Sequence, residues 1–255
     1  MTSFIYGPVP SWRLGKSLGI DMVSTERKIC SFDCIYCQLG DTANPLVERR
    51  EFVPIDEVER SLRSVKGLAA DYATFSGMGE PTLASNLGHS IQLAKSILRL
   101  PVAVLTNSSL MVREDVSRDL AKADVVVAKV DAPSEALFRE INRPFTRQGL
   151  EAVLSALESF RSRFSGKLAL QIMFVEENSD SAEELAEVAR RIMPDEVQVN
   201  TPLRPCPVQP LPREALASVA SKFVNVAPVV TVYEAKKPDV APILLRETLR
   251  RRPSL

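Results

Sequence analysis

The amino-acid sequence predicts an α/β fold in which parallel strands form a partial (β/α)6 barrel of the TIM type. Three observations support this prediction. Six short runs along the chain are nearly continuously apolar, as expected for strands covered on both faces. Helical patterns separate these runs, and such alternation favours a parallel sheet with right-handed crossovers. Six units fall short of the eight in a closed barrel, so a doubly wound open sheet is the alternative.

The predicted elements follow one another with few interruptions. The apolar runs predict strands over residues 18–23, 72–77, 102–107, 125–131, 168–175 and 196–202. Helices are expected over residues 54–65, 87–98, 113–121, 134–141, 149–164 and 181–193. In the first of these, Val58, Leu62 and Val65 recur at helical spacing on one side, which is typical of a helix packed on a core.

The end of the chain is more irregular than the rest. From about residue 203 it is dotted with prolines, and it predicts a helix over 212–223 and a strand over 229–233. Its basic tail, residues 246–252, is interpreted as a solvated helix end. We therefore predict a core over residues 1–205 and a small C-terminal appendage over residues 206–255, packed on that core.

Composition narrows the class of protein. The 255 residues include 32 basic and 32 acidic side chains and are 45% apolar, which fits a globular protein and does not suit a disordered one. No apolar run reaches the length of a membrane helix, and the start lacks a signal-peptide pattern, so we expect a cytoplasmic protein that does not contact membranes. The zero net charge argues against a main role in wrapping nucleic acid. Only Arg49, Arg50 and the basic tail form basic clusters.

Three of the four cysteines lie within eight residues, as Cys30, Cys34 and Cys37. Three thiolates suit an iron–sulfur cluster better than a structural zinc ion, which normally takes four ligands. Three buried thiols, or a zinc site completed by Cys206, are the alternatives. Cys206 by itself is interpreted as a small packed residue in a turn. The one histidine, His89, is remote in sequence and is expected to have no chemical role.

The C-x3-C-x2-C spacing, with an aromatic residue before the last cysteine, resembles the signature of the radical S-adenosylmethionine (SAM) superfamily. The resemblance implies that Cys30, Cys34 and Cys37 hold three irons of a catalytic [4Fe–4S] cluster. The fourth iron would bind the amino and carboxylate groups of SAM, and Tyr36 matches the position that packs near the adenine. It also implies a one-electron reductant of the flavodoxin or ferredoxin type.

A second motif follows the second predicted strand. Gly79-Glu80-Pro81 is similar to the family's Gly-Gly-Glu-Pro segment, which binds the methionine amino group, although Met78 interrupts the glycine pair. The residues themselves agree with this, because glycine lets a backbone approach a ligand and a carboxylate can accept hydrogen bonds from an ammonium group. A tight turn that enters a helix is the alternative.

Polar residues also lie at the ends of later predicted strands, where a barrel places its active site. By similarity, Asn107, Ser108 and Asp131 are candidates for binding the ribose and carboxylate of SAM. We expect a catalytic role for Lys129, because a lysine within an apolar strand is seldom buried without a partner. The remaining candidates are Gln171, Asn200 and Thr201, which could complete the site, and Arg143 and Arg204, for which contact with an anionic substrate and surface ion pairing are equal alternatives.

The predicted activity is reductive cleavage of SAM to methionine and a 5′-deoxyadenosyl radical, which abstracts hydrogen from an unidentified substrate. Residues 6–11, 13–15 and 17–20 resemble the opening of short microbial radical SAM proteins related to the wyosine-forming tRNA enzymes. A tRNA base is therefore one alternative substrate, and a protein or peptide, as for an activase, is another. A third alternative is an electron-transfer or sensor protein whose cluster Cys206 completes.

Overall fold

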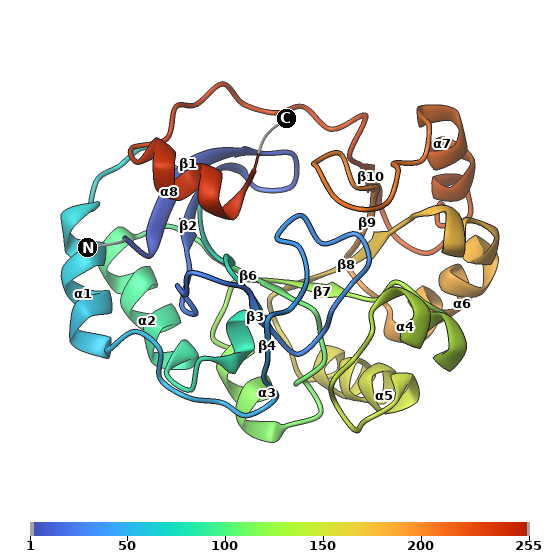
Figure 1. Cartoon of the computed structure of the whole chain (residues 1–255), viewed down its shortest axis with the longest axis horizontal. Coiled ribbons are helices and arrows are strands. Elements are labelled where there is room, and N and C mark those ends of the chain that lie inside the picture. Colours follow the sequence, from blue (N-terminus) through green and yellow to red (C-terminus); the bar gives the residue numbers. More distant parts are fainter. Residues whose placement is uncertain (1–2, 254–255) are drawn as a thin grey trace.

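The computed structural model describes residues 3–253 and contains a curled sheet with helices on its outer side (Figure 1). Its strand order is β1-β2-β5-β6-β7-β8-β9-β10. β1 is antiparallel to β2, and every later pair of neighbours is parallel. This confirms the predicted parallel partial barrel. The strands are β1 (Ile5–Ser11), β2 (Gly15–Ile20), β5 (Tyr72–Phe75), β6 (Val102–Thr106), β7 (Val125–Lys129), β8 (Lys167–Met173), β9 (Glu196–Asn200) and β10 (Val229–Thr231).

The first strands differ from the prediction. Residues 5–11, which no apolar run predicts as a strand, form β1, which is an edge strand and therefore tolerates Pro8 and Pro10. β2 begins three residues earlier than the predicted strand and ends at Ile20. Polar Ser17 was missed because its hydroxyl lies 2.7 Å from the Thr74 hydroxyl of β5, a polar contact that an apolar pattern does not reveal.

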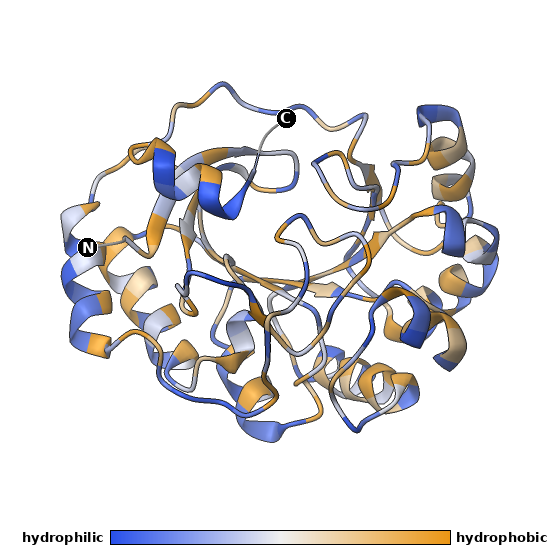
Figure 2. Ribbon diagram, viewed as in Figure 1, coloured by the Kyte–Doolittle hydropathy of each residue, from blue (hydrophilic) through white to orange (hydrophobic). Residues whose placement is uncertain are grey.

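All seven predicted helices are present, with ends that shift by at most three residues, and the basic tail also contains a helix. They are α1 (Ile55–Ser64), α2 (Leu87–Leu98), α3 (Glu114–Leu120), α4 (Glu135–Ile141), α5 (Leu150–Arg161), α6 (Ala182–Ile192), α7 (Arg213–Ser221) and α8 (Leu245–Arg251), with short 3-10 turns η1 (Pro81–Leu83) and η2 (Glu176–Ser181). The helices turn apolar faces to the sheet and polar faces outward (Figure 2). Among residues 3–253, no helix is long and apolar enough to cross a membrane.

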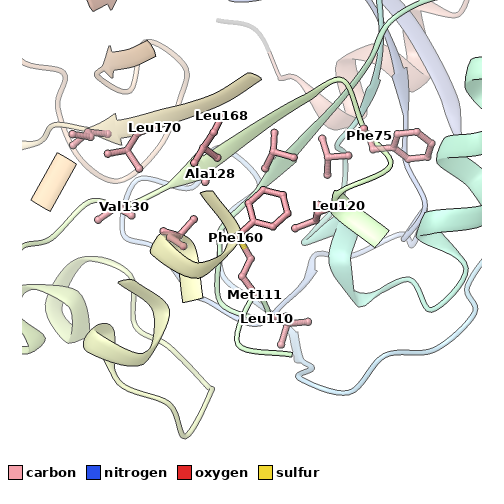
Figure 3. Close-up of a cluster of buried hydrophobic side chains, with 14 of the residues drawn as sticks. Phe75, Leu110, Met111, Leu120, Ala128, Val130, Phe160, Leu168 and Leu170 are labelled. Carbon is pink, nitrogen blue, oxygen red and sulfur yellow. The ribbon is translucent and has the colours of Figure 1, made fainter. Parts of the chain in front are cut away.

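The two faces of the sheet have different packing. Leu168 and Leu170 of β8 join the large core between the sheet and the helices, together with Phe75, Leu120 and Phe160 (Figure 3). The residue between them, Ala169, faces the opposite, concave side. There it packs in a smaller cluster with Leu14, Ala103, Val125 and Val127, which are contributed by the β1–β2 turn, β6 and β7. Side chains that alternate with the core residues along these strands therefore line the concave face.

The C-terminal segment, predicted as an appendage over residues 206–255, contributes β10 to one edge of the sheet. It then crosses to the other edge, where α8 packs on β1 (Figure 1). The interpretation of the tail as a solvated helix end is wrong for Arg251, which is 1% exposed. Its Nε donates to Asp21 Oδ2 at 2.6 Å and its Nη1 to Glu247 Oε2 at 2.8 Å. Arg251 thus ties the end of the chain to the end of β2.

Arg49, counted in the sequence as part of a basic cluster, is also engaged inside the protein. Its Nη1 lies 2.8 Å from Asp115 Oδ2 and its Nη2 lies 2.6 Å from Asp119 Oδ2, both in α3. Only 6% of the Arg49 side chain is exposed. This ion-pair network holds the segment before α1 against α3 and leaves Arg49 unavailable to nucleic acid.

Replacing Asp115 with asparagine is expected to lower stability near pH 7 and to have a smaller effect in acid. The guanidinium groups of Arg113 and Arg49 hold the pKa of the Asp115 carboxyl below its usual range. A carboxyl with a lowered folded-state pKa contributes its stability above its unfolded pKa, and this contribution is lost as the pH falls. Because 39% of the side chain is exposed, we expect at most about 1 kcal/mol. Urea unfolding near pH 7 and pH 2.5 measures it, and equal losses at both would contradict the ion-pair origin.

Candidate functional site

The three clustered cysteines lie at the start of a loop that several segments hold in place. Cys30 ends β3 (Ile29–Cys30), which pairs with the two-residue strand β4 (Asn44–Pro45), and Cys34 and Cys37 follow in the loop. Ile29 N donates to Met78 O at 3.1 Å, and Ile35 N donates to Ile141 O at 3.0 Å. The loop is therefore anchored both to the Gly-Glu-Pro segment and to the end of α4.

Amide groups from distant parts of the chain reach two of the sulfur atoms. Asn107 Nδ2 lies 3.5 Å from Cys30 Sγ, and Asn142 Nδ2 lies 3.5 Å from Cys34 Sγ. All four cysteines are free thiols, and all four are partly buried. Hydrogen bonds to sulfur are one means by which proteins adjust iron–sulfur clusters. The donor set therefore fits a cluster ligated by thiolates.

Lys28 places a positive charge beside the thiols. Its side chain is 3% exposed and donates to Gly40 O at 3.0 Å, with Asp33 Oδ1 at 3.4 Å. Burial alone would lower the pKa of Lys28, but the Cys37, Cys30 and Cys34 thiols raise it above its ordinary value. A lysine in this position favours the thiolate form that binds metal.

Burial raises the pKa values of the Cys30 and Cys34 thiols in the metal-free protein. Burial, with Glu80 and Cys34 adding to it, raises the pKa of Cys30 to about 12. Metal binding must therefore displace protons from these groups. Among residues 3–253, no three His, Cys, Asp or Glu side chains gather closely enough to chelate a single ion. A [4Fe–4S] cluster does not require this, because each thiolate binds a different iron.

Gly79 brings the Gly-Glu-Pro segment against the first cysteine. It forms a parallel bridge with Ile29, and Glu80 N donates to Ile29 O at 3.3 Å. A Cβ atom at Gly79 would lie 1.7 Å from Ile29 O, so only glycine allows the two backbones to approach this closely. This close approach holds Glu80 against Ile29, the residue that precedes Cys30.

Glu80 is buried and accepts several hydrogen bonds. Its Oε1 accepts from Thr82 N at 3.1 Å and from the Thr82 and Thr106 hydroxyls, each at 2.7 Å, while Oε2 accepts from Asn107 N at 2.7 Å. Burial raises the pKa of Glu80, and these donors oppose the effect. A carboxylate offers about four acceptor positions, so Oε2 can accept one further donor.

Tyr36 lies at the centre of a second buried network. Its hydroxyl donates to Asp131 Oδ2, which also accepts from Asn142 Nδ2 at 2.7 Å. Asp131 Oδ1 accepts from Met173 N at 2.8 Å. Lys129 Nζ lies 4.3 Å from the centre of the Tyr36 ring, a cation–π contact. Asn142 thus connects this network to Cys34.

Some of the other predicted site residues are buried and bonded within the protein, and others lie at its surface. Ser108 is fully buried, and its hydroxyl accepts from Lys129 N at 3.0 Å, while Thr201 Oγ1 donates to Phe174 O at 2.9 Å. Their contact with a ligand stays a prediction. Asn200 is 8% exposed at the end of β9. Arg143 is exposed beside a surface pocket lined by Asp33, Cys34 and Cys37, and His89 is exposed on α2, as expected for a residue without chemistry.

Sequence reasoning missed Lys28, Thr106 and Asn142. Lys28 stands two residues before the first cysteine, and a basic residue next to a thiolate motif is a signal that could have found it. Thr106 directly precedes the predicted Asn107. Asn142 had no signal, because 108 residues separate it from Cys34.

A family model described as the radical SAM superfamily matches residues 28–189, a range that contains the cysteine motif, Glu80 and strands β5 to β8. The chain therefore belongs to the radical SAM superfamily. Members of this superfamily are enzymes that use a [4Fe–4S] cluster and SAM, so the predicted class and both predicted cofactors are confirmed at the level of the family.

Within the superfamily, sequence relatives place the chain among the UPF0026 proteins. A UPF0026 protein of Methanocaldococcus jannaschii is 40% identical over 207 residues, covering 78% of this chain and 64% of the relative. One of Synechocystis sp. is 38% identical over 206 residues, covering 80% of this chain and 77% of the relative. The chain thus spans less than two thirds of the length of the first relative. The link to the wyosine-forming enzymes stays a prediction.

Solved structures share the fold. Streptococcus suis SuiB bound to S-adenosylmethionine aligns with a TM-score of 0.63 at 16% identity, covering 83% of this chain and 50% of SuiB. A radical SAM methyltransferase from Sphaerobacter thermophilus aligns with a TM-score of 0.59 at 17% identity, covering 85% of this chain and 66% of that enzyme. At these identities the likeness concerns the fold alone.

Proposed function

We propose that Cys30, Cys34 and Cys37 hold a [4Fe–4S] cluster and that the protein is a radical SAM enzyme acting on a substrate not yet identified. One observation carries the proposal: Asn107 donates through its backbone to Glu80 and through its side chain to Cys30 Sγ. A single residue thus joins the proposed SAM-binding carboxylate to a cluster ligand. When bound, the cluster supplies the electron that cleaves SAM to methionine and a 5′-deoxyadenosyl radical, which takes hydrogen from the substrate.

The residues around the cysteines have separate roles in this proposal. Gly79 lets its backbone approach Ile29, next to Cys30, and Glu80 Oε2 accepts a hydrogen bond from the amino group of SAM. Asn107 orients Glu80, and Tyr36 packs beside the adenine. Lys129 lies over the Tyr36 ring on the concave face, where it can act on the substrate.

Asp131 and Ser108, predicted to contact SAM, have acceptors that the protein already uses. Asp131 binds Tyr36, Asn142 and Met173, and Ser108 binds the backbone of Lys129. We propose that both act mainly by positioning Tyr36 and Lys129. An asparagine at position 131 would then weaken SAM binding through a displaced Tyr36.

The alternative functions stay predictions. Arg49 and Arg251, which the sequence offered for contacts with tRNA phosphates, are held in internal ion pairs. No contact on the described residues favours a peptide substrate, and the reductant and the cellular compartment also stay predictions. An electron-transfer or sensor protein differs from an enzyme in one measurable property, because it would not consume SAM.

Anaerobic reconstitution tests the proposed function. We expect about four irons per chain and, with dithionite and SAM, formation of 5′-deoxyadenosine and methionine. Incubation with a cell extract prepared in deuterated medium should transfer deuterium into 5′-deoxyadenosine and so reveal the substrate. Full iron loading without any cleavage of SAM would contradict the proposal and favour the electron-transfer or sensor protein.

Replacing Gly79 with alanine is expected to destabilise the protein by about 1–3 kcal/mol, because the new Cβ would meet Ile29 O at 1.7 Å. Relief of this clash would move Glu80 away from Cys30, so SAM should bind more weakly. Chemical unfolding and calorimetric titration of SAM into the reconstituted protein measure the two effects. Unchanged SAM affinity would contradict the role given to this contact.

Gly67 provides a matched control for this substitution. Its φ is +84°, but no atom lies within 4 Å of a Cβ added there. Gly67→Ala therefore adds only backbone strain, of about 1–2 kcal/mol, and should leave SAM affinity unchanged.

A further inference from the structure

Three arginines from distant segments lie near one another, since the charges of Arg252 and Arg204 both lower the pKa of Arg13. Arg13 lies in the turn between β1 and β2, Arg204 follows β9, and Arg252 follows α8. Arg13 Nη1 donates to Gln171 Oε1 of β8 at 2.7 Å, so its side chain reaches across the concave face. Arg204 Nη1 donates to Gln38 Oε1 at 2.7 Å. We call Arg13, Arg204 and Arg252 the arginine cluster.

The arginine cluster borders the cysteine loop. Gln38, which accepts from Arg204, directly follows Cys37, and its Nε2 donates to Arg251 O at 2.9 Å, next to Arg252. Gln171, which accepts from Arg13, pairs in register with Lys129 of β7. Lys129 therefore adds a further positive charge at the same level of the sheet.

No carboxylate balances the arginine cluster within the described residues. Among residues 3–253, none of its three members forms an ion pair with Asp or Glu, in contrast to the neighbouring Arg251. Asp21, which directly follows β2, is already paired with Arg251. The two identified partners of the cluster are neutral glutamines.

One donor of the cluster is left unpaired. Arg13 Nε is buried and has no hydrogen-bond partner in the described part of the chain. Burial lowers the pKa of Arg13 to about 9, and Arg252 and Arg204 add to the effect. Burial and Arg252 likewise lower the pKa of Arg204 to about 10. All remain charged at neutral pH, so their mutual repulsion is uncompensated.

We propose that the arginine cluster binds an oxyanion, a phosphate or carboxylate group, of a small substrate whose hydrogen is abstracted at the neighbouring SAM site. This inference rests on the proposed function. Guanidinium groups present a planar set of donors that matches both oxyanions in pairs. A bound anion would satisfy Arg13 Nε and offset the repulsion among the three charges.

The position of the cluster favours a small molecule over RNA. Arginines that contact an RNA backbone are generally exposed, whereas these three are partly buried and share their donors with Gln38 and Gln171. Partly buried guanidinium groups suit the compact terminal phosphate or carboxylate of a small molecule better than the backbone phosphate of a folded RNA.

Anion binding to the reconstituted holoenzyme tests the inference. We would measure the midpoint of thermal unfolding, with SAM present, in increasing pyrophosphate or citrate. A ligand that binds only the folded state raises this midpoint in a saturable manner. We expect saturable stabilisation by at least one anion and a loss of affinity of about tenfold or more in Arg13→Gln and in Arg204→Gln. The anion that binds more tightly distinguishes a phosphate substrate from a carboxylate substrate.

Two controls make the outcome decisive. Arg60→Gln, on α1 with 74% of the side chain exposed, should bind the anion as the wild type does. Without anion, Arg13→Gln should unfold at the same temperature as the wild type or higher, because a repelled charge is removed. A lower midpoint would indicate a structural role and would overturn the inference.

Other outcomes overturn it as well. These are no saturable effect of either anion, equal stabilisation of the wild type and both variants, or a response to tRNA alone. Iron content and SAM cleavage of the wild type report separately on the proposed function. A cluster-loaded, SAM-cleaving protein that ignores both anions would therefore refute only this inference.

Discussion

Replacing Cys34 with alanine is expected to reduce bound iron from about four per chain to near zero and to abolish formation of 5′-deoxyadenosine. Cys34 is one of only three thiols in the motif, and its sulfur receives the Asn142 amide at 3.5 Å. Two thiolates cannot hold a cluster that the proposed function attaches through three. Iron and sulfide analysis, with the visible absorption of the cluster, would measure the loss, and circular dichroism would verify the fold.

Cys206 is the matched control for this substitution. Its thiol donates to Val208 O at 3.2 Å and packs beside Tyr36 and Val175. These contacts fit the small packed turn residue predicted from the sequence, so Cys206→Ala should retain full iron and SAM cleavage. Equal loss of iron in Cys34→Ala and Cys206→Ala would instead indicate a site closed by four thiolates, as in the zinc and sensor alternatives.

Replacing Arg251 with methionine is expected to lower the free energy of unfolding by about 3–5 kcal/mol, because it would leave a buried charge without its partner. Asp21 is 1% exposed and Glu247 is 8% exposed, and the Arg251 guanidinium binds both. The loss should also free α8 from β1 and disturb Arg252. Urea unfolding measures the free energy, and a change below about 1 kcal/mol would contradict the importance of this ion pair.

Two further variants separate charge from packing. Arg250→Met alters the neighbouring residue of α8, whose side chain is 22% exposed, and should have a small effect. Asp21→Asn combined with Arg251→Met should recover part of the stability, since the unpaired carboxylate is removed. Asparagine keeps the Oδ1 atom that accepts from Val23 N at 3.2 Å and from Ser24 N at 2.9 Å. No recovery in the double variant would indicate that the methionine side chain does not fit.

Much of the architecture was predictable because it depends on local patterns. Five strands, β5 to β9, carry apolar residues on the face that the helices cover, and each lies close to its predicted position. The prediction failed for β1 and for the start of β2, where prolines and a polar concave face remove the apolar pattern. It also could not show that the C-terminal segment completes the sheet edge and returns to β1, since a strand and a helix do not specify what they pack against.

The sequence by itself determined the superfamily, the three clustered cysteines proposed as iron ligands and the Gly-Glu-Pro segment, because each is a short motif of residues close in the chain. Only the tertiary structure decided which distant residues surround them. Asn107 and Asn142 reach two of the sulfurs, and the arginine cluster assembles from three segments. These contacts depend on strand register and on the path of the C-terminal segment. Register and chain path are long-range properties of packing, and no local pattern records them.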